Sequence, residues 1–235
     1  MSSKIVILSG AGISAESGIS TFRDANGLWN NYDIMEVASI DGWRKNPEPV
    51  LEFYNQRRCQ LHDVEPNAAH MALVDLEQAY EVVIITQNVD DLHERAGSSQ
   101  VLHLHGELFK ARSTQDASVV YDWRKDIHLG DTCELGSQLR PHIVWFGEEV
   151  PMMLEAVMAI TQADIVVIIG TSMVVYPAAG LVDFAPPEAL LYYIDPQPNI
   201  NYELSLRKNL TILKNPATIG TPELVRQLLS AVTHQ

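Results

Sequence analysis

KIVILSGAGIS, residues 4–14, is the stretch that decides the fold of this chain. Its apolar run Lys4–Leu8 predicts a buried strand. The strand leads into a turn of small residues, Gly10, Ala11 and Gly12, followed by Ser14 and an expected helix. Such a turn lets the backbone approach a pyrophosphate, and free N–H groups of the helix can bind it. The GxGxS pattern is not the full GxGxxG fingerprint, so a tight turn without a ligand stays open as an alternative.

The rest of the chain alternates apolar runs with helical stretches. The expected strands are Lys4–Leu8, Glu81–Thr86, Val101–Leu104, His142–Phe146, Ile165–Ile169, Leu190–Ile194 and Leu210–Leu213. The expected helices are His70–Gln78, Asp90–Arg95, Pro151–Gln162, Ala178–Phe184 and Thr221–Val232, the last capped by Thr221 with Pro222 at its first position. This order predicts an α/β fold with a doubly wound, mostly parallel Rossmann-like sheet.

Two stretches break this rhythm and lack clear strands, residues about 25–63 and about 112–138. We expect them to be insertions that pack together as a small second lobe of a single catalytic unit, residues 1–235. The Rossmann core would then comprise about 1–24, 64–111 and 139–235. A ligand cleft is expected between the lobe and the carboxyl ends of the strands.

Small polar residues also follow two later strands. Gly170, Thr171 and Ser172 come directly after ADIVVIIG, and Asp195 follows LLYYI. Because the carboxyl ends of parallel strands share one edge of the sheet, these residues are placed to hold a dinucleotide from its other side. Asp195 suits a ribose hydroxyl, and a simple turn before Pro196 explains it equally well.

A third polar group marks the expected reaction end of the cleft. Gln87, Asn88 and Asp90 follow the strand VVII, where they can bind a ligand, cap a helix, or do both. His103 and His105 face the same side if the strand extends through both. His105 precedes Gly106 at the expected cleft, and its ordinary pKa near 6.5 suits a general base. A metal site on the two histidines is disfavoured because no third ligand lies at a familiar spacing.

The composition limits the partners and the compartment. The formal charge is −14, from 16 basic and 30 acidic side chains, which argues against nucleic acid and suits cationic, lysine-rich partners or simple solubility. No apolar stretch reaches the roughly 20 residues of a spanning helix, and no leader is apparent, so we expect no membrane association. Two cysteines are too few for a disulfide framework. We expect a soluble cytoplasmic protein.

Five segments together resemble the sirtuin family, in family order and over nearly the whole chain. They are GAGISAESGISTFRDANGLW (10–29), TQNVDDLHERAG (86–97), HLHGEL (103–108), RPHIVWFGE (140–148) and GTSMVVYPAAGL (170–181). The resemblance implies NAD-dependent deacylation of lysine in proteins or peptides, releasing nicotinamide and 2′-O-acyl-ADP-ribose. It leaves NAD-dependent protein ADP-ribosyltransfer open as an alternative. A non-catalytic NAD sensor is disfavoured because His105 and Asn88 are both present. We expect a monomer.

The resemblance also assigns roles to residues. His105 would be the general base, with Asn88 holding the ribose and a water. The positions expected to bind NAD are Gly10, Ala11, Gly12, Ser14, Phe22, Arg23, Gln87, Asn88, Asp90, Gly170, Thr171, Ser172, Asp195 and Ala217. The positions expected to bind the substrate are Tyr54, Arg57, Val144, Phe146, Gly147 and Val174. Among these, Phe22 would shield the reactive sugar carbon, and Phe146 would wall the acyl-lysine tunnel.

The segment PVLEFYNQRRCQLH, residues 49–62, predicts a helix on which Tyr54 and Arg57 share a face. The pair resembles the sirtuin branch that accepts succinyl- and malonyl-lysine. A guanidinium can bind the acyl carboxylate through paired hydrogen bonds, and a tyrosine hydroxyl can add a third. The alternative is a packed tyrosine beside a solvated arginine.

One feature departs from the resemblance. Most sirtuins bind a structural zinc through two CxxC pairs, but Lys110–Arg140 holds only Cys133, with Ser113 where the first cysteine is expected. One thiolate cannot make a tetrahedral zinc site, so we expect no metal. We expect packing to hold the lobe instead, with the candidates Tyr121, Trp123, Ile127 and Leu129.

Overall fold

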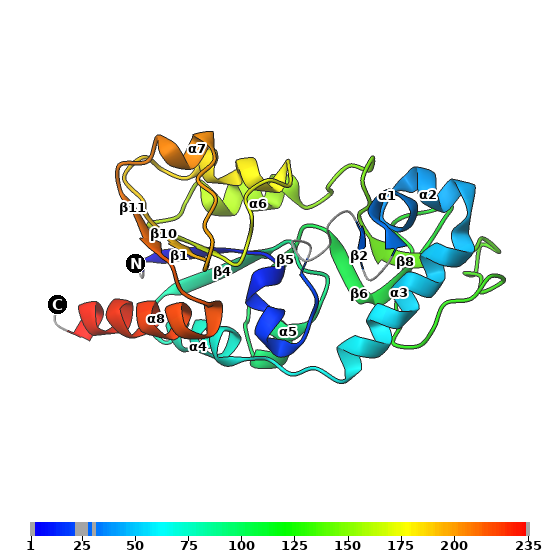
Figure 1. Ribbon diagram of the computed structural model, residues 1–235, viewed down its shortest axis with the longest axis horizontal. Helices are drawn as coiled ribbons and strands as arrows, with labels where there is room; N and C mark the ends of the chain where they lie inside the picture. Colours follow the sequence, from blue (N-terminus) through cyan, green and yellow to red (C-terminus); the bar gives the residue numbers. More distant parts are fainter. Residues whose placement is uncertain (1–2, 22–27, 30–31, 234–235) are drawn as a thin grey trace.

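The computed structural model describes residues 3–21, 28–29 and 32–233, and it is built on a six-stranded parallel sheet (Figure 1). In spatial order the strands are β11 (Leu210–Leu213), β10 (Leu190–Ile194), β9 (Ile165–Ile169), β1 (Lys4–Ser9), β4 (Glu81–Thr86) and β5 (Val101–His103). The chain proceeds from β1 outward to β5, then returns to the other side of β1 as β9. The direction of winding therefore reverses between β1 and β9, which is where α/β sheets bind ligands.

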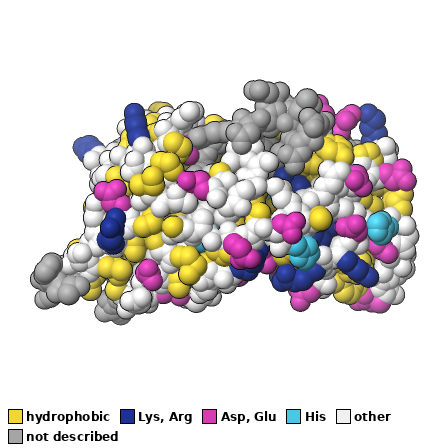
Figure 2. Space-filling model, turned by 60° about the horizontal axis from the view of Figure 1, so that its bottom comes forward, with side chains coloured by type: hydrophobic (Ala, Val, Ile, Leu, Met, Phe, Trp, Pro, Cys, Tyr) yellow, Lys and Arg dark blue, Asp and Glu magenta, His cyan; other side chains and the backbone are white. Residues whose placement is uncertain are grey.

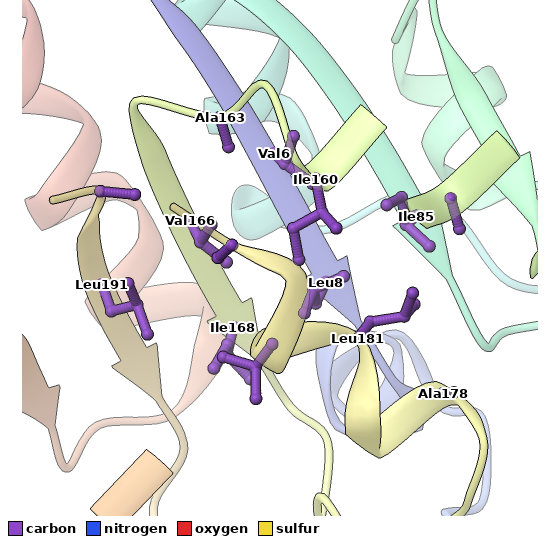
Figure 3. Close-up of a cluster of buried hydrophobic side chains, with 14 of the residues drawn as sticks. Val6, Leu8, Ile85, Ile160, Ala163, Val166, Ile168, Ala178, Leu181 and Leu191 are labelled. Atoms are coloured by element: carbon purple, nitrogen blue, oxygen red, sulfur yellow. The ribbon is translucent and has the colours of Figure 1, made fainter. Parts of the chain in front are cut away.

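Alternate residues of β1 serve the two faces of this sheet. Val6 and Leu8 join one buried cluster (Figure 3). Ile5 and Ile7 join the cluster on the other face. Helices α4 (Ala68–Leu76) and α8 (Ala217–Thr233) pack on the Ile5 face. Helix α6 (Met153–Ile160) and the 3₁₀ helix η4 (Ala178–Phe184) pack on the Val6 face. The predicted doubly wound sheet is confirmed.

A second, three-stranded antiparallel sheet forms the core of the small lobe, at the right in Figure 1. Its order is β7 (Val120–Asp122), β6 (Gly106–Ser113) and β8 (Leu139–Ile143). The helices α1 (Ile34–Val37), α2 (Ile40–Lys45) and α3 (Pro47–His62) accompany it. The expected strand His142–Phe146 was wrong, because β8 begins and ends earlier and is not in the parallel sheet. Strand β6 crosses the expected boundary between 111 and 112, and β8 lies within 139–235, which was expected to belong to the Rossmann core.

Apolar packing holds the inner part of this lobe. Ile127 is fully buried beside Leu51 and Leu139, with Tyr121 and Trp123 packed against them. Leu129 was a wrong candidate, since it is 49% exposed. At Ser113, where the first zinc cysteine is expected in the family, the hydroxyl lies 2.7 Å from the Ser137 hydroxyl. The Cys133 thiol lies 3.1 Å from the Ser137 hydroxyl.

The remaining elements include β2 (Leu28–Trp29), β3 (Tyr32–Asp33), α5 (Leu92–Ala96) and α7 (Tyr202–Ser205). The expected start of the last helix was wrong: α8 begins at Ala217, and Pro222 lies inside it. The Thr221 hydroxyl is buried without a hydrogen-bond partner in the described part of the chain. Instead, Glu16 accepts hydrogen bonds from the backbone N–H and the hydroxyl of Thr218, in the first turn of α8. No helix in the described ranges is long and apolar enough to cross a bilayer.

Candidate active site

A cavity of about 810 Å³ lies between the two lobes, at the carboxyl ends of β1, β4, β9 and β10. Most of the residues that we expected to bind NAD or substrate line it. They are Gly10, Ala11, Gly12, Tyr54, Arg57, Gln87, Asn88, Asp90, His105, Val144, Phe146, Gly147, Gly170, Thr171, Ser172, Asp195 and Ala217. The fold therefore gathers segments from most of the chain into one site.

The two glycine turns pack directly on each other at the floor of the cavity. The Gly12 N–H donates to the Gly170 carbonyl over 2.8 Å, and a Cβ on Gly12 would lie 2.6 Å from the Gly170 Cα. Gly170 itself has φ +59, a left-handed conformation that favours glycine. These glycines are thus required for turn-to-turn packing, which sequence reasoning missed. After β1 the chain forms short 3₁₀ turns, Ala11–Ile13 and Ala15–Ser17, and not the expected regular helix.

Ser14 lies behind the cavity wall and organises two residues within it. Its hydroxyl donates to Asp90 Oδ2 over 3.0 Å and accepts from Asn88 Nδ2 over 3.1 Å. Asp90 Oδ1 also accepts the Leu92 N–H, so Asp90 supports α5 while lining the cavity. Burial raises the pKa of Asp90, although its hydrogen bonds to Leu92 and Ser14 oppose this shift. Ser14, which we expected among the NAD-binding residues, has no exposed surface.

His105 and His103 are held differently despite lying two residues apart. Strand β5 ends at His103, so the expected extended alternation through His105 was wrong. His105 Nδ1 lies 3.1 Å from the Gln87 carbonyl, which fixes the N–H at Nδ1 and leaves Nε2 as an acceptor; His105 lines the cavity. Burial lowers the pKa of His105, and the bond to Gln87 offsets this only in part. The His105 ring is therefore neutral at physiological pH.

His103 bonds Glu94 Oε1 at 2.7 Å and the Asn88 carbonyl at 3.0 Å. Burial alone would lower the pKa of His103, but its hydrogen bond to Glu94 and the charge of Glu94 outweigh this and raise it. Among the described residues no three His, Cys, Asp or Glu side chains gather as a metal site.

Two buried histidines behind the wall were missed by sequence reasoning. The rings of His70 and His93 lie 4.9 Å apart, and His93 Nε2 lies 2.9 Å from the Ser9 hydroxyl. Ser9 donates to the Thr86 hydroxyl, which accepts the Asn88 backbone N–H. Burial lowers the pKa of both histidines, so their rings are uncharged at neutral pH and support the cavity wall from behind. Only the pattern of small polar residues at strand ends could have indicated such a network.

Tyr54 and Arg57 lie on α3 and are 2% and 6% exposed, in the cavity wall. Burial raises the pKa of Tyr54 to about 12 and lowers that of Arg57 to about 10. Both groups therefore carry their protons at neutral pH. The Arg57 guanidinium also lies 5.5 Å from the centre of the Phe53 ring. The alternative of a solvated arginine is wrong, because the side chain is buried.

The segment that follows β8 borders the same part of the cavity. The Phe146 N–H donates to the Ala38 carbonyl, and the Phe146 carbonyl accepts the Ile40 N–H. The Val144 N–H likewise donates to the His105 carbonyl, so the backbones of Phe146 and Val144 are both engaged within the protein. Val174, which we also expected to bind the substrate, is 55% exposed and is not in the cavity wall. Phe22 and Arg23 lie outside the described residues.

The residues present fit a dinucleotide. Asn88 Oδ1 is buried and has no hydrogen-bond partner among the described residues, so a ligand donor would satisfy it. The glycine turns leave backbone rather than side chains at the cavity floor. Asp195, whose Oδ1 accepts the Gln197 N–H, lines the cavity beyond β10 together with Ala217. A carboxylate at a strand end in this position suits a ribose hydroxyl.

Comparisons with known proteins agree with this geometry. The Sir2 family model matches residues 10–177. The NAD-dependent protein deacylase of Helicobacter pylori (strain J99) is 56% identical over 231 residues, covering 98% of this chain and 97% of that protein. A Sir2 homologue mutant in complex with ADP-ribose has a TM-score of 0.89 at 37% identity, covering 100% of this chain and 95% of its own. A Sir2 mutant bound to a p53 peptide and NAD has a TM-score of 0.75 at 27% identity, covering 100% and 95%.

The chain belongs to the Sir2 family of Rossmann-like NAD-binding enzymes. Within that family it is an NAD-dependent protein deacylase, which acts on acylated protein substrates. The resemblance seen in the five sequence segments is confirmed, and so are the cofactor and the class of reaction.

Proposed function

We propose that this deacylase removes acidic acyl groups, such as succinyl and malonyl, from lysine in addition to acetyl, with His105 as its general base. The observation that carries the acyl assignment is a buried guanidinium, that of Arg57, in the wall of the cavity that His105 also lines. NAD, when bound, supplies the ADP-ribose that accepts the acyl group as nicotinamide leaves. The chain itself must then remove a proton, hold the sugar and exclude water.

His105 Nε2 suits the proton-transfer role, because the Gln87 carbonyl holds the other ring nitrogen as a donor. Asn88 Oδ1 would accept a hydrogen bond from the sugar or the amide of the cofactor. Ser14 holds Asn88 and Asp90 in place from behind. Such a preorganised polar wall stabilises developing charge without rearranging during the reaction.

The acyl assignment rests on charge and on burial. A guanidinium binds a carboxylate through two parallel hydrogen bonds, and a site removed from water strengthens the attraction. Arg57 retains its positive charge at neutral pH, since its pKa is lowered only to about 10. Tyr54, three residues earlier on the same helix, can donate its hydroxyl proton to the same carboxylate. A neutral acetyl group uses neither interaction.

A panel of acetyl-, succinyl- and malonyl-lysine peptides of one sequence, with NAD and nicotinamide release as the readout, tests this proposal. The wild type should turn over all three. Arg57→Met should lower kcat/KM for the acidic acyl peptides by roughly 10- to 100-fold, the usual effect of losing hydrogen bonds to a charged group. The loss for the acetyl peptide should be much smaller.

Arg44→Met is the matched control, because Arg44 is also in the small lobe but its side chain is 71% exposed. It should leave the ratio of succinyl to acetyl turnover unchanged. An equal loss for all peptides in Arg57→Met, or a wild type without activity on succinyl-lysine, would refute the acidic acyl site.

We also propose that the enzyme works in the cytoplasm as a monomer and does not bind nucleic acid. The net charge of −14 supports cationic, lysine-bearing partners over phosphate backbones. On the face shown in Figure 2, acidic and basic side chains are interspersed. Gel filtration with light scattering tests the monomer, and an excess of mass over 26.2 kDa would contradict it.

A further inference from the structure

A side-chain hydrogen bond joins Tyr54 to Trp145 across the small lobe. The Trp145 Nε1–H donates to the Tyr54 hydroxyl over 3.0 Å, and both side chains are 2% exposed. Tyr54 belongs to α3, and Trp145 follows β8, so the bond connects two elements that are distant in sequence. Both residues line the cavity, as does Arg57. The bond therefore lies at the site assigned above to the acyl carboxylate.

This bond restricts the direction of the Tyr54 proton. A phenol hydroxyl has one proton, which prefers the plane of the ring and so has two favoured orientations. The indole N–H takes the acceptor position on one side, which leaves the proton the other orientation. Accepting a hydrogen bond also polarises the hydroxyl and makes it a stronger donor. Trp145 therefore prepares Tyr54 as a donor in a fixed direction.

Trp145 is itself held firmly. The Arg140 guanidinium lies 3.4 Å from the centre of its ring, and the Trp43 ring lies 5.4 Å away. The Trp145 backbone N–H donates to Glu148 Oε2 over 2.9 Å. Arg140 binds both oxygens of the same carboxylate, at 2.7 and 2.9 Å. A donor anchored by an ion pair and two ring contacts has little freedom to turn away from Tyr54.

We propose that Trp145 is a positioning residue for acyl specificity, which directs the Tyr54 hydroxyl proton toward the carboxylate of an acidic acyl chain. This inference rests on the proposed function above, in which Tyr54 and Arg57 bind that carboxylate. Acetyl-lysine has no carboxylate, so its turnover depends on Trp145 only through packing. Trp145 thus acts on specificity through Tyr54 and not on the reacting atoms.

Trp145→Phe removes the indole donor and keeps an aromatic ring. For succinyl-lysine we expect kcat/KM to fall about tenfold, the loss typical of one hydrogen bond to a charged group. The change should appear in KM with kcat largely kept, because the bond serves bound substrate and transition state alike. The loss for acetyl-lysine should be several times smaller. Trp145→Met, which also lacks a donor but has a different shape, should give the same split and replaces Trp145→Phe if that variant does not fold.

A double-mutant cycle separates this role from simple packing. In a Tyr54→Phe background there is no hydroxyl to direct, so adding Trp145→Phe should lower succinyl turnover no further. Trp123→Phe is the matched control, because it makes the same chemical change in the small lobe at a side chain that donates to the Asp126 carbonyl and does not line the cavity. It should leave the ratio of succinyl to acetyl turnover unchanged.

Two kinds of failure can be told apart. If Arg57→Met and Tyr54→Phe selectively lower succinyl turnover but Trp145→Phe and Trp145→Met do not, this inference is overturned and the acidic acyl site stands. It is also overturned if the effect of Trp145→Phe persists in full without the Tyr54 hydroxyl. If the Arg57→Met loss is equal for both peptides, the acidic acyl site fails, and the role of Trp145 fails with it.

Discussion

The two halves of the cavity are built in different ways. The nucleotide half consists of consecutive residues in turns at the carboxyl ends of parallel strands, such as Gly10–Gly12 and Gly170–Ser172. The proposed acyl half consists of side chains from separate elements, Tyr54 and Arg57 on α3 and Trp145 after β8, packed within the small lobe. The first half depends on backbone approach, and the second on charge and hydrogen-bond direction. Changes in each half should therefore alter different kinetic constants.

His105 is the proposed general base for every acyl group, so its loss should have the largest effect. His105→Ala should lower kcat by roughly 10²–10⁴-fold for acetyl and succinyl peptides alike, the usual contribution of a positioned general base. NAD affinity, measured by calorimetry, should stay close to that of the wild type, because the Gly10–Gly12 turn and Asn88 are untouched. The kcat is measured from peptide turnover under saturating NAD.

His128→Ala serves as the control for this change, because His128 is exposed and does not line the cavity. It should retain full turnover. A His105→Ala enzyme within a few-fold of wild type would remove His105 from the reaction. A loss confined to one acyl group would place His105 in the acyl half alone.

Gly12→Ala should affect the nucleotide half of the cavity and leave the proposed acyl half unchanged. The added Cβ would lie 2.6 Å from the Gly170 Cα, so the two turns must move apart. We expect the free energy of unfolding to fall by about 1–3 kcal/mol, the usual effect of overpacking. The KM for NAD should rise, while the ratio of succinyl to acetyl turnover stays constant because α3 is not involved. Chemical denaturation and NAD titrations measure both effects.

Gly180→Ala is the matched control, since its nearest neighbour would be Tyr176 at an ordinary 3.6 Å. Its stability and its KM for NAD should both stay near the wild-type values. If Gly12→Ala changed the acyl ratio instead, the separation of the two halves would be wrong.

The nucleotide half could be predicted from sequence because each of its motifs is local. Each motif directly follows an apolar strand: Gly10–Gly12, Gln87–Asp90 and Gly170–Ser172. Parallel strands bring their carboxyl ends to the same edge of the sheet. The reason for the glycines was missed, since the close contact of Gly12 with Gly170 joins residues far apart in the chain.

The other errors of the sequence-based predictions have the same cause, which is contact between residues far apart in the chain. Thr221 and Pro222 resemble a helix start, but Glu16 caps α8 earlier from more than 200 residues away in the chain. The strand β6 was missed because it belongs to an antiparallel sheet with no counterpart in the βα rhythm. In the acyl half, spacing on one helix revealed Tyr54 and Arg57. Trp145 was not singled out, because its bond to Tyr54 exists only in the folded chain.

The pH dependence of kcat/KM should also distinguish the two halves of the cavity. We expect its effects to be smaller than those of the substitutions above. Burial lowers the pKa of His105, and a general base works only when unprotonated, so activity is lost as pH falls through that pKa. For both peptides the acid limb of kcat/KM should therefore lie below pH 6.5, the ordinary value for histidine. An acid limb above pH 6.5 that His105→Ala abolishes would contradict the lowered pKa.

An alkaline limb should appear for the succinyl peptide alone. Arg57 loses its proton as pH rises through about 10, and the attraction for the acyl carboxylate disappears with it. The ratio of succinyl to acetyl kcat/KM should therefore be flat from pH 7 to 9 and fall toward pH 10. A ratio that stays constant across this range would show that the charge of Arg57 does not act on the acyl group.

Metal removal should have the smallest effect, because we expect no zinc beneath the acyl half. Between Lys110 and Arg140 the only thiol is that of Cys133, and its neighbours are the hydroxyls of Ser113 and Ser137. Neutral hydroxyls are poor zinc ligands, whereas Ile127, Leu139 and their neighbours already form a buried apolar cluster. Treatment with a chelator should therefore leave the melting temperature and both activities unchanged. One tightly held zinc per chain, or a drop in melting temperature that added zinc restores, would mean that metal and not packing fixes the lobe that carries Tyr54 and Arg57.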